Sequence, residues 1–144
     1  MTAPGLLVNI DVEDLDKATR FYCEGLGLTV GRRFDGWLEL VGAAAPIYLL
    51  PKAAGTPVSP RTKHSRDYKR HWTPVHLDFV VPDIGAAVAR ALAAGATLER
   101  EATTHAYGNI ALLADPWGNG FCLLEFVGGG YDEITLKDPG PAPA

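Results

Sequence analysis

Two stretches of the chain repeat one pattern of hydrophobic and polar positions. Residues 6–12 and 75–81 alternate apolar and polar side chains, which predicts a strand with one buried face in each. The apolar positions are Leu6, Val8, Ile10 and Val12 in the first stretch and Val75, Leu77, Phe79 and Val81 in the second. The two stretches therefore open two similar units.

Each predicted strand is followed by a helix and then by three more strands. Asp14 and Asp83 are suited to cap the helix N-termini, and Gly27 and Gly95 are suited to end the helices. Short apolar stretches then predict strands at 28–34, 37–42 and 46–52 in the first half, and at 97–107, 109–114 and 121–127 in the second. Each half thus reads β-α-β-β-β, so the predicted fold class is α+β.

The repeat predicts a single pseudo-symmetric domain made of two βαβββ modules. Module 1 spans about residues 5–52 and module 2 about residues 73–127, with a linker at about 53–72. A tail follows at about 128–144, and its end is expected to be loosely held. In each module the helix covers one sheet face, so we expect the two open faces to curl around a shared cleft.

Composition narrows the classes of partner. A formal net charge of −4 at pH 7 disfavours nucleic-acid binding. The first residues lack the pattern of a secretory signal, and no apolar run is long enough to cross a membrane. Two cysteines, Cys23 and Cys122, fit a reducing compartment, so a cytoplasmic location is expected.

His76 and Asp78 are predicted on the open face of the second sheet, where they would face the cleft. His76 is a candidate acid–base catalyst and Asp78 its orienting partner. The alternative is an ion pair that only satisfies the sheet. Cys122 is either a thiolate activated by His76 or a small buried hydrophobic residue.

Further residues are expected to line the cleft as ligand-binding positions. Strand alternation and position near turns select an apolar, aromatic set, typical of small-molecule sites. With the residues above, the predicted binding set is Asn9, Trp37, Tyr48, His76, Asp78, Cys122, Leu124 and Phe126. It predicts a small, largely apolar or aromatic ligand.

The linker sequence RTKHSRDYKRHW, residues 61–72, is dense in basic and aromatic side chains. Three interpretations stay open. The segment is a solvated connection that also helps dimerisation, a clamp for an anionic ligand, or a mobile lid.

Three segments resemble the vicinal oxygen chelate superfamily, in its glyoxalase-like branch. They are VEDLDKATRFYCEGLGL at 12–28, HLDFVVPDIGAAVARALAAGA at 76–96 and LADPWGNGFCLLEF at 113–126. The superfamily includes glyoxalase I, bleomycin-resistance proteins and extradiol dioxygenases. The resemblance implies paired βαβββ modules and a homodimer, which would also cover unpaired sheet edges.

The resemblance also implies where a metal would be bound. In metal-dependent members the ligands lie on the first and last strands of each module, and the matching positions here are Leu7, Tyr48, His76 and Cys122. Only His76 is a usual ligand, so we expect no metal centre of the usual kind and no cofactor. A rearranged divalent-metal site would use His76 with Cys122, joined by Asp78 or Glu125; Asn9, which shares strand parity with Leu7, could also stand near that position.

Three functions remain as hypotheses. The first is a protein that binds a small molecule without converting it. The second is a glyoxalase-like lyase or isomerase with His76 as acid–base catalyst and Asp78 orienting it. The third is an extradiol dioxygenase-like enzyme, which would need an iron site that these residues do not assemble.

Overall fold

The computed structural model describes residues 2–136 and has an α+β fold, as the sequence predicts. The first module contains β1 (Val8–Val12), α1 (Leu15–Arg20), a π-helical turn η1 (Phe21–Gly25), β2 (Thr29–Arg33), β3 (Leu38–Val41) and β4 (Ile47–Pro51). The second contains β5 (Leu77–Val80), α2 (Ile84–Ala93), β6 (Thr97–His105), β7 (Gly108–Ala114) and β8 (Gly120–Phe126). The strand orders are β1-β4-β3-β2 and β5-β8-β7-β6, so β1 and β5 lie at equivalent sheet edges.

Both helices begin at the predicted residues; α2 ends just before Gly95 as predicted, whereas α1 ends at Arg20 and η1 continues it toward Gly27. Asp14 accepts a hydrogen bond from the Lys17 backbone at 3.0 Å, and Asp83 accepts one from the Ala86 backbone at 2.9 Å. Beyond the helices Gly27 and Gly95 have φ of +73° and +111°, a region that glycine enters without a steric cost. The π-helical turn η1 that continues α1 was not predicted.

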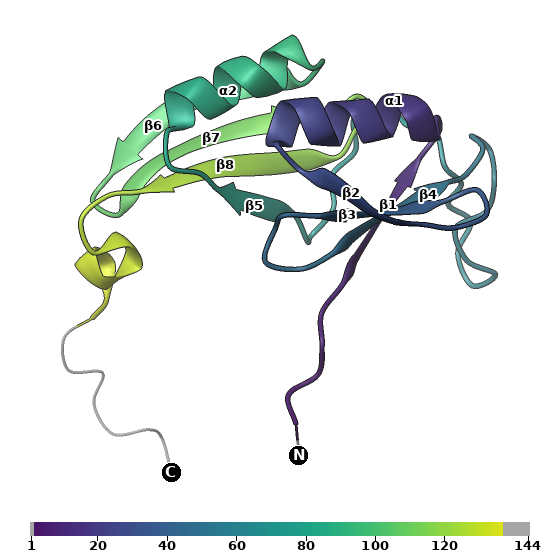
Figure 1. Cartoon of the computed structure of the whole chain (residues 1–144), viewed down its shortest axis with the longest axis horizontal. Coiled ribbons are helices and arrows are strands. Elements are labelled where there is room, and N and C mark those ends of the chain that lie inside the picture. The colour runs from purple at the N-terminus through teal and green to yellow at the C-terminus, as the bar shows by residue number, and fades with distance from the viewer. Residues whose placement is uncertain (1, 137–144) are drawn as a thin grey trace.

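The helices cover one face of the sheets and leave the other open. Figure 1 shows α1 and α2 side by side on the same side of the two sheets. Strand register and burial place alternate residues in the core under the helices, among them Val12, Leu40, Leu49, Leu113 and Leu123. The intervening residues, including Asn9, Tyr48, Asp78 and Cys122, lie on the open faces.

Two predicted strand residues are wrong. Leu6 was expected on the buried face of the first strand, but it is 74% exposed and β1 begins only at Val8. Val75 was expected on the buried face of the second, but it is 77% exposed and β5 begins only at Leu77. For Val75 the reason is the partner strand: β8 begins at Gly120, and its first register pair with β5 is Leu77 with Phe121. The chain before Leu77 therefore has no ladder to join.

The linker has no regular helix or strand and carries one isolated bridge, between Pro57 and Ser65. After Phe126 the tail forms a short 3-10 turn, η2 (Gly130–Ile134), whose Tyr131 ring lies 4.8 Å from the Phe126 ring. The predicted loose end of the tail falls on residues 137–144, outside the described residues. Between residues 2 and 136 no helix is long and apolar enough to cross a membrane.

The two modules contact each other through buried groups. Gly25 of η1 lies against Ala94 at the end of α2. The Tyr22 hydroxyl donates a 2.5 Å hydrogen bond to the Asp115 carboxylate, and both residues are buried. The Phe21 ring packs edge-on against Trp117. These contacts fix the position of β1 relative to β5.

Candidate functional site

A cavity of about 700 Å³ lies at the junction of the two modules. Strands β1 and β5, the linker and the turn between β7 and β8 line it. Five aromatic side chains contribute to its walls: Tyr22, Tyr68, Trp72, Phe79 and Phe121. Its volume lies in the range of small-molecule sites, and its lining combines these rings with polar and charged side chains, among them Asp11, His64, Arg66 and His71.

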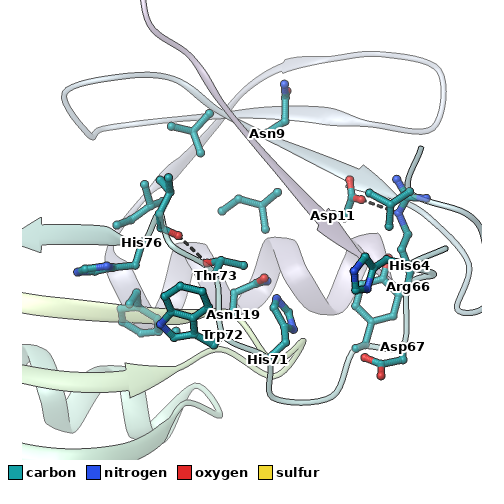
Figure 2. Close-up of a pocket in the computed structure, with 18 of the residues that line it drawn as sticks. Asn9, Asp11, His64, Arg66, Asp67, His71, Trp72, Thr73, His76 and Asn119 are labelled. Carbon is teal, nitrogen blue, oxygen red and sulfur yellow. Dashed lines mark hydrogen bonds and ion pairs between the residues drawn. The ribbon is translucent and has the colours of Figure 1, made fainter. Parts of the chain in front are cut away.

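The linker forms one wall of this cavity and is anchored to the first module. Arg66 donates from Nε to the Asp11 carboxylate at 2.6 Å and from Nη1 to the Pro57 carbonyl at 2.7 Å. The Tyr68 hydroxyl donates to the Lys52 carbonyl at 2.6 Å, and Tyr68 has a left-handed φ of +51°, which is uncommon outside glycine. Figure 2 shows Arg66 and Asp11 paired beside His64.

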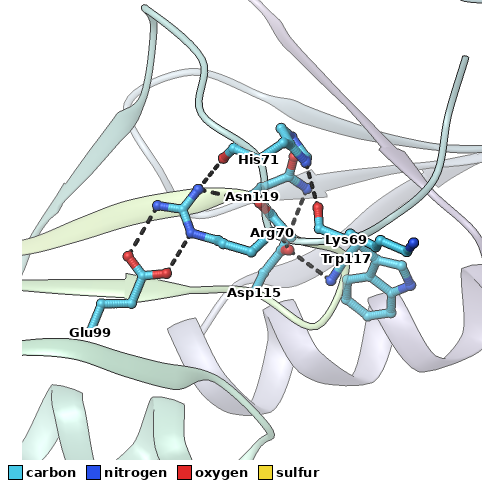
Figure 3. A network of polar contacts seen from close by, with 8 residues as sticks. Lys69, Arg70, His71, Glu99, Asp115, Trp117 and Asn119 are labelled. Atoms are coloured by element: carbon cyan, nitrogen blue, oxygen red, sulfur yellow. Dashed lines mark hydrogen bonds and ion pairs between the residues drawn. The ribbon is translucent and has the colours of Figure 1, made fainter. Parts of the chain in front are cut away.

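The linker is also anchored to the second module. Figure 3 shows the Arg70 guanidinium between the Glu99 carboxylate and the His71 carbonyl, and one Arg70–Glu99 hydrogen bond measures 3.0 Å. This pairing lowers the pKa of Glu99. The His71 backbone also donates to the Gly118 carbonyl at 3.2 Å. Residues 66–71 therefore connect both modules beside the cavity, to whose lining Arg66, Tyr68 and His71 belong.

Asp115 organises the turn at the back of the cavity. Its Oδ1 accepts hydrogen bonds from the Trp117 and Asn119 backbones at 2.8 and 2.9 Å, and its Oδ2 accepts from the Asn119 side chain at 2.9 Å. Tyr22 supplies a further donor. Burial and the Asp115 charge raise the Tyr22 pKa well above its usual range, so the phenol stays protonated as the donor. The network places Asn119 at the cavity wall.

Two of the predicted binding residues, Asn9 and His76, line this cavity. Figure 2 shows Asn9 on the β1 side and Trp72, His71 and Asn119 on the opposite side. His76 Nε2 lies 3.2 Å from Asp78 Oδ1, the pair expected for a histidine oriented by a carboxylate. The His76 side chain is 55% exposed.

The other predicted binding residues lie on the open sheet faces, outside the lining of this cavity. On the first sheet, Trp37 stacks on Phe34 at 3.9 Å, and Arg32 and Tyr48 both donate to Glu39 at 2.7 and 2.9 Å. Hydrogen bonds from Arg32, with its charge, lower the pKa of Glu39 to about 2. On the second sheet the open face carries Asp78, Cys122, Leu124 and Phe126.

The register tests whether the four metal positions implied by the resemblance suit a metal. Asn9 pairs with Tyr48 in the first sheet, and Asp78 pairs with Cys122 in the second. Leu7 lies two residues before Asn9 and His76 two residues before Asp78, so Leu7 and His76 occupy equivalent positions in the two modules. Leu7 offers no donor atom, and the Tyr48 hydroxyl is engaged by Arg32 and Glu39. The usual four-ligand centre does not fit these residues.

Asp78 and Glu125 were both candidates for a third ligand beside His76 and Cys122. The structure places Asp78 next to these two residues and Glu125 on the other face of the sheet. Glu125 lies on the helix side, where it accepts hydrogen bonds from the Ile84 backbone at 2.6 Å and the Asn109 side chain at 3.0 Å. The donor atoms of His76, Asp78 and Cys122 lie within 4.8 Å of one another. Burial, and then the Asp78 charge, raise the pKa of the Cys122 thiol to about 11, so the metal-free thiol is neutral near pH 7.

Several residues of the cavity were not predicted individually. The linker contributes His64, Arg66, Tyr68, His71 and Trp72, and the turn contributes Asn119. The signal in the sequence was the density of basic and aromatic residues in 61–72, but its position against the modules depends on the ion pairs of Arg66 and Arg70. Asn119 appeared only as part of a turn.

Comparison with known proteins places the chain in a family. The model of the glyoxalase-like domain family matches residues 7–124. No curated protein matches the sequence.

Solved structures with the same fold include binding proteins and enzymes. TnmS3, an antibiotic-binding protein from Streptomyces sp. CB03234, is 23% identical with a TM-score of 0.62, covering 88% of this chain and 98% of TnmS3. The fosfomycin resistance protein FosX from Listeria monocytogenes is 15% identical with a TM-score of 0.70, covering 94% and 100%. A glyoxalase/bleomycin resistance protein/dioxygenase family enzyme from Burkholderia phytofirmans PsJN is 21% identical with a TM-score of 0.63, covering 84% and 97%.

The family match covers most of the chain, including both modules, the linker and the turn that carries Asn119. The chain therefore belongs to the glyoxalase-like domain family.

Proposed function

We propose that this protein binds a small, largely apolar or aromatic molecule in the cavity between its modules, without the usual metal centre of the family. The observation that carries the proposal is the cavity of about 700 Å³ with aromatic walls. Polar side chains of the lining, including Asn9, His76 and Asn119, would orient the ligand between the aromatic walls. TnmS3, which shares the fold, is itself an antibiotic-binding protein.

A blocking substitution tests the proposal. Asn9→Trp places a bulky ring in the cavity wall. Leu7→Trp is the control, because it introduces the same ring two residues earlier, at an exposed position that does not line the cavity. The probe is the fluorescent dye anilinonaphthalene sulfonate, and small aromatic compounds compete with it. We expect Asn9→Trp to weaken dye binding at least about 10-fold, or 1.4 kcal/mol, and Leu7→Trp to leave it unchanged. Equal binding by all three proteins would contradict the proposal.

A second candidate function is a glyoxalase-like lyase or isomerase. The supporting observation is the His76–Asp78 pair, because His76 lines the cavity and Asp78 lies 3.2 Å from its ring nitrogen. Turnover of a 2-oxoaldehyde hemithioacetal that falls in His76→Ala would favour this function. If the protein only binds its ligand, His76→Ala should lower the affinity for that ligand, and neither wild type nor variant should show turnover. Within residues 2–136 the cluster of three potential metal ligands is His76, Asp78 and Cys122, which does not supply the histidine and glutamate ligands that the dioxygenase hypothesis requires.

We further propose a homodimer in a reducing, cytoplasmic compartment. Apolar side chains near the cavity support an association surface, since Leu6, Trp72 and Val75 are 74%, 81% and 77% exposed. Light scattering after size exclusion measures the mass directly. A monomer at micromolar concentration would contradict the homodimer without affecting the cavity.

A further inference from the structure

Three metal-binding side chains converge on the open face of the second sheet. His76 directly precedes β5, two residues before Asp78, and Cys122 is the register partner of Asp78 on β8. Their donor atoms lie within 4.8 Å of one another, with His76 Nε2 and Asp78 Oδ1 at 3.2 Å. Backbone pairing therefore sets Asp78 beside Cys122, and His76 directly precedes the strand that carries Asp78.

We propose that His76, Asp78 and Cys122 bind a zinc ion. The site differs from the family's usual centre, which takes ligands from both modules, because all three ligands here come from module 2 and Asp78 is not at a usual ligand position. The proposal does not rest on the proposed function. Only His76 is shared with the cavity lining.

The donor chemistry selects the metal. Zinc accepts imidazole nitrogen, carboxylate oxygen and thiolate sulfur in one tetrahedral site, whereas calcium and magnesium prefer oxygen ligands. Zinc–ligand bonds of about 2.0–2.3 Å place neighbouring tetrahedral ligands roughly 3.3–3.7 Å apart. The 3.2 Å between His76 Nε2 and Asp78 Oδ1 is close to this spacing, and the Cys122 Sγ lies within 4.8 Å of both.

The environment leaves room for a fourth ligand. Cys122 is only 5% exposed, while His76 and Asp78 have side chains 55% and 32% exposed. The metal would therefore bind at the boundary between the buried thiol and the surface, with one position open to water or a small ligand. Binding releases the thiol proton to solvent, because the thiolate is the form that coordinates zinc.

Cobalt(II) gives a direct test, since a thiolate bound to cobalt absorbs in the near ultraviolet by sulfur-to-cobalt charge transfer. Tag-free protein is reduced, treated with chelator, exchanged into metal-free buffer and titrated with cobalt chloride. We expect a saturable charge-transfer band that zinc chloride abolishes by displacement. Cys122→Ser should lose the band, and His76→Ala and Asp78→Asn should weaken cobalt binding at least about 10-fold.

Cys23→Ser is the matched control, because Cys23 lies on η1 in the other module and should not affect the band. Since Cys122 is buried, circular dichroism checks that its variant is folded, and Asp78→Asn supplies a second variant at an exposed site. The proposal is overturned if wild-type protein shows no band, if Cys122→Ser keeps it, if Cys23→Ser loses it, or if Asp78→Asn binds cobalt as tightly as wild type. Dye binding by chelator-treated protein reports on the cavity separately, so the two proposals fail independently.

Discussion

At the residue scale, single side chains on the open face of the first sheet are held by charge pairing. Glu39 is buried and accepts hydrogen bonds from Arg32 at 2.7 Å and from the Tyr48 hydroxyl at 2.9 Å. The Arg32 guanidinium also lies over the Phe34 ring, at 5.7 Å from its centre. Tyr48 was selected from the sequence as a ligand-binding residue, and its hydroxyl belongs to this network.

The network predicts a dependence of stability on pH. The pKa of Glu39 falls from its ordinary value near 4.5 to about 2 on folding, so ionised Glu39 stabilises the folded state above pH 4.5. That contribution is lost as the pH falls from 4.5 through 2. Glu39→Gln has no such titration. We therefore expect the difference in unfolding free energy between wild type and Glu39→Gln to shrink over this range, as measured by urea unfolding at successive pH values.

Glu13→Gln is the control, because Glu13 is an exposed glutamate of the same module. Its difference from wild type should stay nearly constant over the same pH range. A difference between wild type and Glu39→Gln that stays constant down to pH 3 would contradict the role assigned to Arg32.

At the scale of elements, the packing of η1 against α2 depends on a small residue. A Cβ atom on Gly25 would lie 2.9 Å from the Ala94 Cβ and 3.7 Å from the Ala91 Cα. These atoms belong to or adjoin the backbone, so they cannot move aside by rotating a side chain. The sequence placed Gly25 inside a helix but did not indicate that another helix approaches it.

Gly25→Ala should therefore destabilise the protein. Overpacking at such a contact costs about 1–3 kcal/mol, measured as the loss in unfolding free energy in urea. Gly85→Ala is the matched control within α2, where the new Cβ would meet only Asp83 Oδ1 at an ordinary 3.5 Å. Because alanine favours helix, we expect this control to gain up to about 1 kcal/mol. Equal effects of the two substitutions would show that η1 and α2 are not closely packed.

At the scale of the whole molecule, a few buried contacts join the two modules, and the linker spans their junction. Tyr22 of the first module donates to Asp115 of the second, and Asp115 also holds the turn that carries Asn119 to the cavity. Arg66 and Arg70 fasten the linker to the first and second modules, respectively. The cavity is therefore a property of the assembled chain and of neither module alone.

Tyr22→Phe tests this connection. The substitution leaves the ring in place and removes the hydroxyl donor to a buried carboxylate, for which we expect a loss of about 1.5–3 kcal/mol in unfolding free energy. Tyr131→Phe is the control, because the Tyr131 side chain is half exposed, and it should change stability by less than about 0.5 kcal/mol. A change for Tyr22→Phe as small as for the control would contradict a stabilising link between the modules.

Local patterns were sufficient to predict most of the elements. Alternation located β1 and β5, and the caps at Asp14 and Asp83 located the helices, because these signals depend on neighbours in sequence. Alternation also predicted His76 and Asp78 on one side of the chain, and the two side chains lie 3.2 Å apart. It failed at Val75, where a strand requires a partner and β8 has not yet begun. The π-helical turn after α1 has no comparable signal in the sequence.

The sequence by itself thus determined the two-module fold and the faces of most strand residues. Only the tertiary structure decided where the cavity lies and what encloses it, because the linker is positioned by ion pairs between residues far apart, such as Arg66 with Asp11 and Arg70 with Glu99. The same holds for Asp78 and Cys122, separated by most of the second module and brought together by strand register. Alternation assigns a side chain to a face, but only packing and register assign it a partner.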